Sequence, residues 1–312
     1  MLNWLKFSFI SLFLITFSVC ISKAQTTDIM AAEKSLLELL KETRLEKSDS
    51  VRISLNEAFV TLLAKTLYGQ DSYVWPFDSL NIGKLNSADK KIRIFNWNIQ
   101  QNDRTNLYSM VILNMELKKV IVMKTSPALQ VLDENAVYKN GDWPGGLIYR
   151  LIERKDGPKD LYILLSWDGF SPQTSRKSID ALSFDKDGMP VFGAPVFKTK
   201  EGLRNRVVSA YAASSAFTQS YDRQKVSLSN VRKSQRKIDD EIIVLDRLVP
   251  MSAELEGQRW AYVPAGNIYD GYVYFNNYWT FVEDIAPRNP AEPGKKPAKK
   301  PVSYELFPEM LN

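Results

Sequence analysis

Two patterns of hydrophobic positions divide the chain, a helical one near the N-terminus and a strand-like one over most of the rest. Between residues 25 and 70, apolar side chains recur at three- and four-residue spacing, which predicts a helical hairpin. Ser54 and Glu57 fit a capping box at the start of the second helix, and Gly69 fits its C-terminal end. No heptad repeat is sustained, so we interpret the hairpin as packing against its own β domain.

From residue 71 to residue 285 the pattern changes to short apolar or alternating runs separated by clusters of Gly, Pro, Asn and Asp. Such runs predict strands, and their short connections predict a largely antiparallel arrangement. The expected fold class is mainly β (α+β), an antiparallel β-sandwich or open barrel preceded by the helical hairpin. A propeller is disfavoured because no blade-length repeat is found. The run KVSLSNV in the basic stretch 225–240 fits a strand, and the alternative for this stretch is an exposed hairpin or loop.

The clearest strand pattern covers residues 160–197, which predict three consecutive strands joined by turn sequences such as Asp-Gly. Strict alternation places Asp180 on the same face as Leu182, where a buried carboxylate needs a partner that Arg176 would supply. The functional alternative is that Arg176 and Lys177 hold a polar or anionic ligand at the rim of the sheet.

Two tryptophans lie beside turn signals rather than in strand centres, Trp143 in NGDWPGG and Trp167 in SWDGF. Aromatic rings exposed at such turns would form platforms for a ligand. The candidate ligand-binding residues are therefore Trp143, Trp167, Asp168, Arg176, Lys177 and Asp180.

Composition excludes several kinds of chemistry, because the chain has no histidine and one cysteine. A Ser-His-Asp triad, a Cys-His pair and a histidine-ligated zinc site are impossible. Asp185 and Asp187 resemble part of a calcium loop, but its further ligands are missing at the required offsets, and an Asp-Gly turn explains the pattern better. We therefore predict no catalytic residue, no metal ligand and no cofactor.

Residues 1–24 predict a signal peptide, with Lys6, an apolar run, and small residues before a cleavage site after Ala24. An uncleaved membrane helix is disfavoured because the run is shorter than the ~20 residues that span a bilayer. Lipidation at Cys20 is a further alternative, although the residues before it fit a lipobox poorly. The expected location is outside the cytoplasm, with the periplasm, the outer membrane and the extracellular space as the alternatives. The formal net charge is +5, and removal of Lys6 and Lys23 with the signal peptide leaves 41 − 2 − 36 = +3, which is too small to indicate a nucleic-acid partner.

Residues 286–302 are rich in Pro and Lys and predict an extended linker. The segment 303–312 that follows carries Tyr304, Leu306 and Phe307, side chains that gain nothing unless they dock on a surface. They would pack on the parent domain or be captured by a partner through strand addition or groove binding, and the remaining alternative is a frayed terminus. We take Tyr304, Leu306 and Phe307 as candidate partner-binding residues.

Two stretches of the β region, residues 164–197 and 245–273, resemble a group of exported envelope proteins of Gram-negative bacteria that has no established activity. The resemblance implies a place in the envelope and no particular reaction. We therefore expect a non-catalytic binding or assembly module of the cell envelope that docks to a protein partner. The alternatives are a carboxylate-based glycan hydrolase, which needs two facing carboxylates, and a carbohydrate-binding module, which needs exposed aromatic rings.

Overall fold

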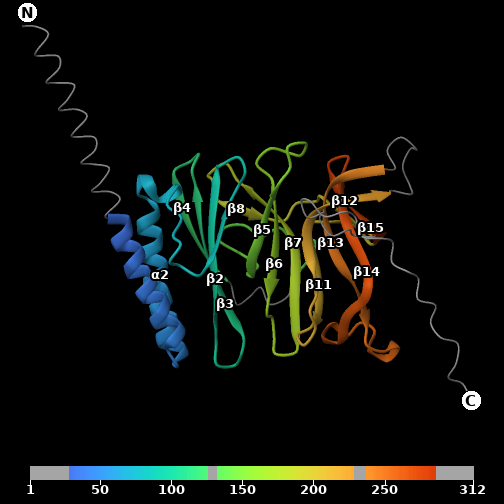
Figure 1. The fold of residues 1–312 in the computed structure, drawn as a ribbon, viewed down its shortest axis with the longest axis horizontal. Coiled ribbons are helices and arrows are strands. Elements are labelled where there is room, and N and C mark those ends of the chain that lie inside the picture. The colour runs from blue at the N-terminus through green and yellow to red at the C-terminus, as the bar shows by residue number, and fades with distance from the viewer. Residues whose placement is uncertain (1–27, 126–131, 228–236, 286–312) are drawn as a thin grey trace, which may run out of the picture.

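The computed structural model describes residues 28–125, 132–227 and 237–285. In this part of the chain two helices that pack together are followed by three β-sheets, none of which closes into a barrel (Figure 1). The expectation of a mainly β fold preceded by a helical hairpin is confirmed. No helix in these ranges combines the length and the hydropathy that a membrane span requires.

The first helix covers residues 28–45, and helix α2 runs from Asp49 to Leu67. A short 3₁₀ helix, η1, follows at Gln70–Tyr73. The predicted start of α2 at Ser54 is wrong: the N-cap is Ser48, and the Ser54 hydroxyl donates to the Ser50 carbonyl inside the helix. The earlier start has a physical cause, because Arg52 pairs with Asp49 at 2.8 Å and donates to the Glu46 carbonyl, which fixes the first turn.

The first sheet is an antiparallel meander in the order β1-β2-β3-β4. Its strands are β1 Gly83–Asn86, β2 Ile92–Gln100, β3 Asn106–Asn114 and β4 Lys119–Lys124. The Asn96 side chain joins it to the second sheet, since its amide donates to the Ile148 carbonyl and accepts from the Ile148 N–H.

The second sheet has the order β11-β7-β6-β5, with β8 added to β7. Its strands are β5 Leu147–Glu153, β6 Tyr162–Asp168, β7 Thr174–Phe184, β8 Pro190–Phe192 and β11 Arg206–Ala212.

The third sheet has the order β10-β9-β15-β14-β13-β12 and contains one parallel pair, β15 with β9. Its strands are β9 Phe197–Thr199, β10 Gly202–Arg204, β12 Gln219–Ser227, β13 Lys237–Pro250, β14 Tyr262–Phe275 and β15 Tyr278–Ile285. Two 3₁₀ helices, η3 Ala253–Leu255 and η4 Arg259–Ala261, lie between β13 and β14. Residues 225–227 and 237–240 of the basic stretch lie in the paired ends of β12 and β13, and residues 228–236 lie outside the described part of the chain.

The stretch 189–197, expected to be one strand, divides between two sheets as β8 and β9. Gly193 lies at the crossing with φ +100°, and a Cβ there would approach the Ala136 carbonyl oxygen to 2.8 Å. A side chain would therefore obstruct the bend, and glycine allows the chain to change sheets.

Buried clusters place the layers in the order helices, first sheet, second sheet, third sheet. Phe59 and Leu63 of α2 pack on Phe95 of the first sheet. The second sheet is covered on both faces, with Leu182 of β7 in the cluster toward the first sheet and Ile179 in the cluster toward the third. This confirms the predicted alternation along β7.

Candidate functional site

The second sheet separates the predicted ligand-binding residues onto its two faces. Asp168, Arg176 and Asp180 share a strand face with Leu164 and Leu182, toward the first sheet. Trp167 and Lys177 point to the other face, toward the third sheet. The six residues therefore do not converge on one ligand.

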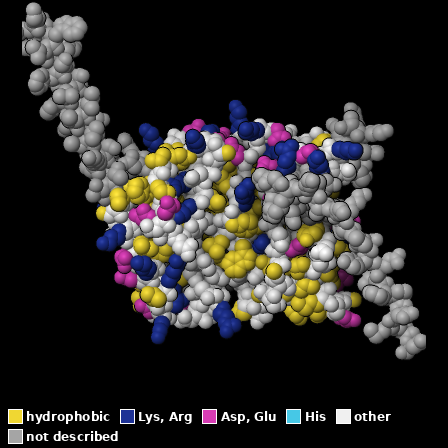
Figure 2. Space-filling model, in the orientation of Figure 1, with side chains coloured by type: hydrophobic (Ala, Val, Ile, Leu, Met, Phe, Trp, Pro, Cys, Tyr) yellow, Lys and Arg dark blue, Asp and Glu magenta, His cyan; other side chains and the backbone are white. Residues whose placement is uncertain are grey.

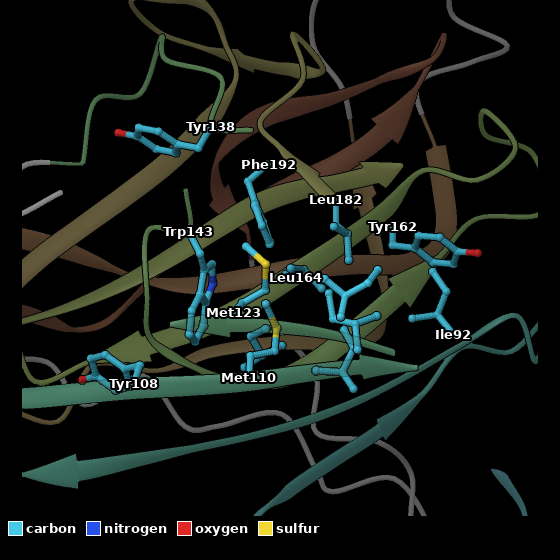
Figure 3. Close-up of a cluster of buried hydrophobic side chains, with 14 of the residues drawn as sticks. Ile92, Tyr108, Met110, Met123, Tyr138, Trp143, Tyr162, Leu164, Leu182 and Phe192 are labelled. Carbon is cyan, nitrogen blue, oxygen red and sulfur yellow. The ribbon is translucent and has the colours of Figure 1, made fainter. Parts of the chain in front are cut away.

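Trp143 is 2% exposed and packs in the same buried cluster as Met110 and Met123, between the first and second sheets (Figure 3). The expectation of an exposed platform at this residue is wrong. Gly145 and Gly146 adopt positive φ values of +83° and +105°, so the turn that follows Trp143 bends the chain and leaves the indole inside.

Asp180 is 5% exposed, and its carboxylate pairs with Arg206 rather than with the predicted Arg176. Strand register explains the difference, because Arg206 of β11 lies directly opposite Asp180 of β7. The buried Arg206 guanidinium also donates to the carbonyls of Asp133 and Ala136, at 2.6 and 2.8 Å. Burial raises the pKa of the Asp180 carboxyl, and the charge of Arg206 opposes that effect.

Asp168 and Arg176 bind each other at the β6–β7 hairpin. Asp168 Oδ1 also accepts a hydrogen bond of 2.9 Å from the Tyr108 hydroxyl, which accepts one of 3.0 Å from the Gly169 N–H. Burial and the neighbouring Asp168 charge raise the pKa of Tyr108. The Arg176 guanidinium lies 3.9 Å from the centroid of the Phe170 ring. These contacts give Asp168 and Arg176 a structural role, and ligand binding by them stays a prediction.

Lys177 lies between aromatic rings, with Nζ 5.4 Å from the Tyr149 centroid and 5.8 Å from the Phe217 centroid. Burial lowers the pKa of Lys177, and the negative charge of Asp246 partly offsets that effect. Trp167 lies opposite Lys177 in the strand register and is half-buried. Trp167 and Lys177 are thus a second pair of predicted residues that the fold brings together, on the opposite face of the sheet from Asp168 and Arg176.

A cavity of about 420 Å³ lies near Lys177, between β11 and the third sheet. We call it the bulge cavity. Its lining is Lys200, Ser209, Leu245, Asp246, Arg247, Leu248, Asp270 and Glu283. Ser209 is the register partner of Lys177.

Two breaks in strand register shape the bulge cavity. One break lies at Arg247 and the other at Asp270, so these side chains leave the regular alternation of their strands. They bind each other, with 3.0 Å between Arg247 Nε and Asp270 Oδ2, and Arg247 also pairs with Asp284 at 2.8 Å. These carboxylates raise the pKa of Arg247. Its charge and that of Asp270 are thus satisfied within the protein, and in the described ranges no group of three or more acidic side chains is placed to hold a metal ion.

An open groove of about 590 Å³ lies on the other side of the molecule, between α2 and β4. We call it the α2–β4 groove. It is lined by Glu57, Val60, Thr61, Ala64, Lys65, Tyr68, Val122 and Lys124. Figure 2 shows hydrophobic side chains among basic and acidic ones over the helices and neighbouring strands at this end of the molecule.

Four of the eight residues that line the α2–β4 groove are apolar, and they differ in exposure, since Val60 at its base is only 4% exposed. Val60, Ala64 and Tyr68 recur every four residues and so form one stripe along α2. Tyr68 just after the helix is 66% exposed, and Val122 of β4 is 40% exposed. Glu57 and Lys124 form an ion pair of 2.8 Å from α2 to β4, and Lys65 is exposed beside them.

Strand β4 is the last strand of the first sheet and pairs only with β3 among the described residues. Its other edge has no strand partner among those residues, and an edge of this kind has unpaired backbone N–H and C=O groups. Sequence reasoning missed this surface. The run KKVIVMK indicates a strand but does not indicate that Val122 is exposed. The exposure of Val122 depends on the position of β4 at the edge of its sheet, which the sequence does not show.

No family model, curated protein or solved structure matches the chain. The predicted signal peptide 1–24, linker 286–302 and partner-binding residues Tyr304, Leu306 and Phe307 lie outside the described residues.

Proposed function

We propose that the protein is a non-catalytic binding module of the cell envelope that docks to a protein partner through the α2–β4 groove. The observation that carries the proposal is an apolar stripe of α2, lined up beside an edge strand whose own valine, Val122, is exposed. A groove next to an unpaired sheet edge accepts an extended peptide, since main-chain hydrogen bonds give affinity and alternate side chains give specificity.

The partner segment is extended and apolar at every second residue. Added beside β4, such a strand satisfies the edge N–H and C=O groups and directs half of its side chains toward Val60, Ala64 and Tyr68. An apolar side chain of leucine size buried there contributes roughly 1.5–3 kcal/mol.

Charge at the groove favours a partner with acidic residues. Lys65 and Lys124 line it together with Glu57, which leaves one positive charge in excess. The contribution of such exposed charges is mainly to specificity and association rate.

The two alternative functions have less support. The burial of Trp143 removes one of the two predicted sugar platforms, which weakens the carbohydrate-binding alternative. Asp270 in the bulge cavity is bound by Arg247, which weakens the hydrolase alternative.

The envelope location rests on the signal-like residues 1–24 and on the resemblance to exported proteins.

A matched pair of variants tests the proposal. Val122→Asp places a charge in the groove, whereas Val51→Asp places the same charge on α2 at a residue with similar exposure, 45% against 40%. Partner capture is measured by crosslinking in cells that express the full chain, with thermal unfolding as the control for folding. We expect Val122→Asp to reduce the captured partner at least tenfold and Val51→Asp to leave it unchanged. Equal capture by both variants would refute docking in the groove.

A further inference from the structure

We propose that the segment docking in the α2–β4 groove is residues 303–312 of a second copy of this chain, so that copies associate head to tail. The inference rests on the proposed function and names the occupant of the same groove. It follows from the chemistry of that segment, from the position at which β15 ends, and from the distance the linker must cover.

The segment SYELFPEMLN has the pattern that the groove requires. Tyr304 and Leu306 are two residues apart, so an extended backbone directs both to one face. Pro308 cannot donate a backbone hydrogen bond and therefore ends the added strand after Phe307.

The charge of the segment complements the groove. It contains Glu305 and Glu309 and no lysine or arginine. Glu305 alternates with Tyr304 and Leu306 and points to the other face of the added strand, so the acidic residues act through the net charge of the segment. The groove presents Lys65 and Lys124, of which Lys124 is paired with Glu57. An acidic segment is therefore favoured over the basic linker that precedes it, which fixes which part of the chain after β15 enters the groove.

The position of β15 favours a second copy over the same chain. Its last residue, Ile285, belongs to the third sheet, whereas the groove lies between the helices and the first sheet, at the opposite end of the stack of layers (Figure 1). Layers packed about 10 Å apart place the two roughly 30 Å from each other, before any detour around the sheets.

The 17 residues of 286–302 reach about 50 Å when fully extended. Within one chain the linker would have to follow the surface along the whole stack, a path longer than the direct separation, which restricts its conformations and costs entropy. Between two copies stacked end to end the same linker spans a shorter path. The tail and the groove are different surfaces, so the interface between two copies is heterologous. In a dimer one copy keeps a free groove and the other keeps a free tail, and further copies can add at both ends.

A complementation experiment tests this arrangement. One variant ends at Val302 and keeps the groove, and the other carries Val122→Asp and keeps the tail. Sedimentation velocity is run on the wild type, on each variant and on an equimolar mixture. We expect concentration-dependent association for the wild type, monomers for each variant alone, and a one-to-one dimer in the mixture. The same mixture made with a Val51→Asp chain in place of the Val122→Asp chain associates further, because its groove stays intact.

A peptide-binding experiment distinguishes the ways in which the proposal could be wrong. A fluorescent peptide of residues 303–312 is titrated into the variant that ends at Val302, beside a peptide with Leu306→Asp. We expect saturable binding of the first and at least tenfold weaker binding of the second. Peptide binding together with a monomeric wild type would overturn the second copy in favour of docking within one chain. Absence of peptide binding, with a different partner still lost on Val122→Asp, would overturn the inference and leave the proposed function standing.

Discussion

Asp180 on β7 and Arg206 on β11 form a buried ion pair, with 3.0 Å between Oδ2 and Nε and side-chain exposures of 6% and 0%. Arg206 also donates to the Phe192 carbonyl, so one guanidinium connects the edge strand β11 to the chain near the crossing from β8 to β9. Since neither charge reaches water, the pair is stable only while both members are present.

Removal of Arg206 is therefore expected to be severe. Arg206→Met should lower the free energy of unfolding by about 3–5 kcal/mol, because it leaves a buried carboxylate without a partner. The loss should shrink as the pH falls toward 4, because protonation of Asp180, whose pKa burial raises, removes the uncompensated charge. Urea unfolding at pH 7 and pH 4.5 measures both effects. Arg223→Met breaks an exposed pair with Asp239 and should cost far less.

Tyr108 gives a prediction with the opposite pH dependence. Tyr108→Phe removes the hydroxyl that binds Asp168 and the Gly169 N–H, and should cost roughly 1–3 kcal/mol at pH 7. In the wild type the raised pKa keeps the folded phenol protonated while the unfolded one ionises near pH 10, so stability falls above that pH. The variant should fall less steeply in alkaline urea titrations. Tyr68→Phe, at an exposed residue, is the control and should match the wild type.

Lys177 should be a residue where charge is unfavourable. Burial lowers the pKa of Lys177 in the folded protein, so the charged side chain destabilises the folded state. This destabilisation is complete below the folded-state pKa and disappears above the unfolded-state pKa near 10.4. Lys177→Met should therefore raise the free energy of unfolding at pH 7, with a smaller gain at pH 10. Lys198→Met, at an exposed lysine over the Tyr278 ring, should give no such gain. A loss of stability in Lys177→Met at pH 7 would contradict the prediction.

Gly193 and Gly141 form a matched pair for the crossing between sheets. Both have positive φ, +100° and +93°, but a Cβ meets the Ala136 carbonyl only at Gly193 and nothing within 4 Å at Gly141. Gly141→Ala should cost about 1 kcal/mol of backbone strain, and Gly193→Ala clearly more. Midpoints of thermal unfolding measure the difference, and equal midpoints would show that the crossing adapts to a side chain.

Glu57 should weaken the binding of an acidic segment. Its carboxylate pairs with Lys124, and that contact lowers the pKa of Glu57, so the groove keeps this negative charge at neutral pH. Glu57→Gln should strengthen binding of the 303–312 peptide by about two- to fivefold at low salt, with the gain lost at high salt. Titration of the chain that ends at Val302 at two ionic strengths measures this. Glu38→Gln, which breaks an exposed pair with Lys41 on the first helix, is the control and should leave binding unchanged.

Features that depend on neighbours in the sequence were predicted well. The helical hairpin, most strands of the three sheets and the two faces of β7 follow from residue spacing. The start of α2 was missed because contacts of Arg52 outweighed the capping pattern at Ser54. The division of residues 189–197 was missed because a single glycine allows the chain to leave one sheet for another.

The candidate site was predicted less well, because partners across strands depend on register. Arg206 is 26 residues from Asp180 in sequence, and only the pairing of β11 with β7 makes it the partner in place of Arg176. Trp143 has the turn sequence of an exposed residue, yet the first and second sheets close over it.

The sequence by itself determined most of the secondary structure, the alternation of buried and polar positions along β7, and the absence of histidine chemistry, since each depends on residue type and local spacing. Tertiary structure alone decided which strand is an edge, which charges pair and where α2 leaves Val122 uncovered. The physical reason is that a strand looks alike in sequence whether its edge is paired or open, so the α2–β4 groove exists only once β4 is last in its sheet.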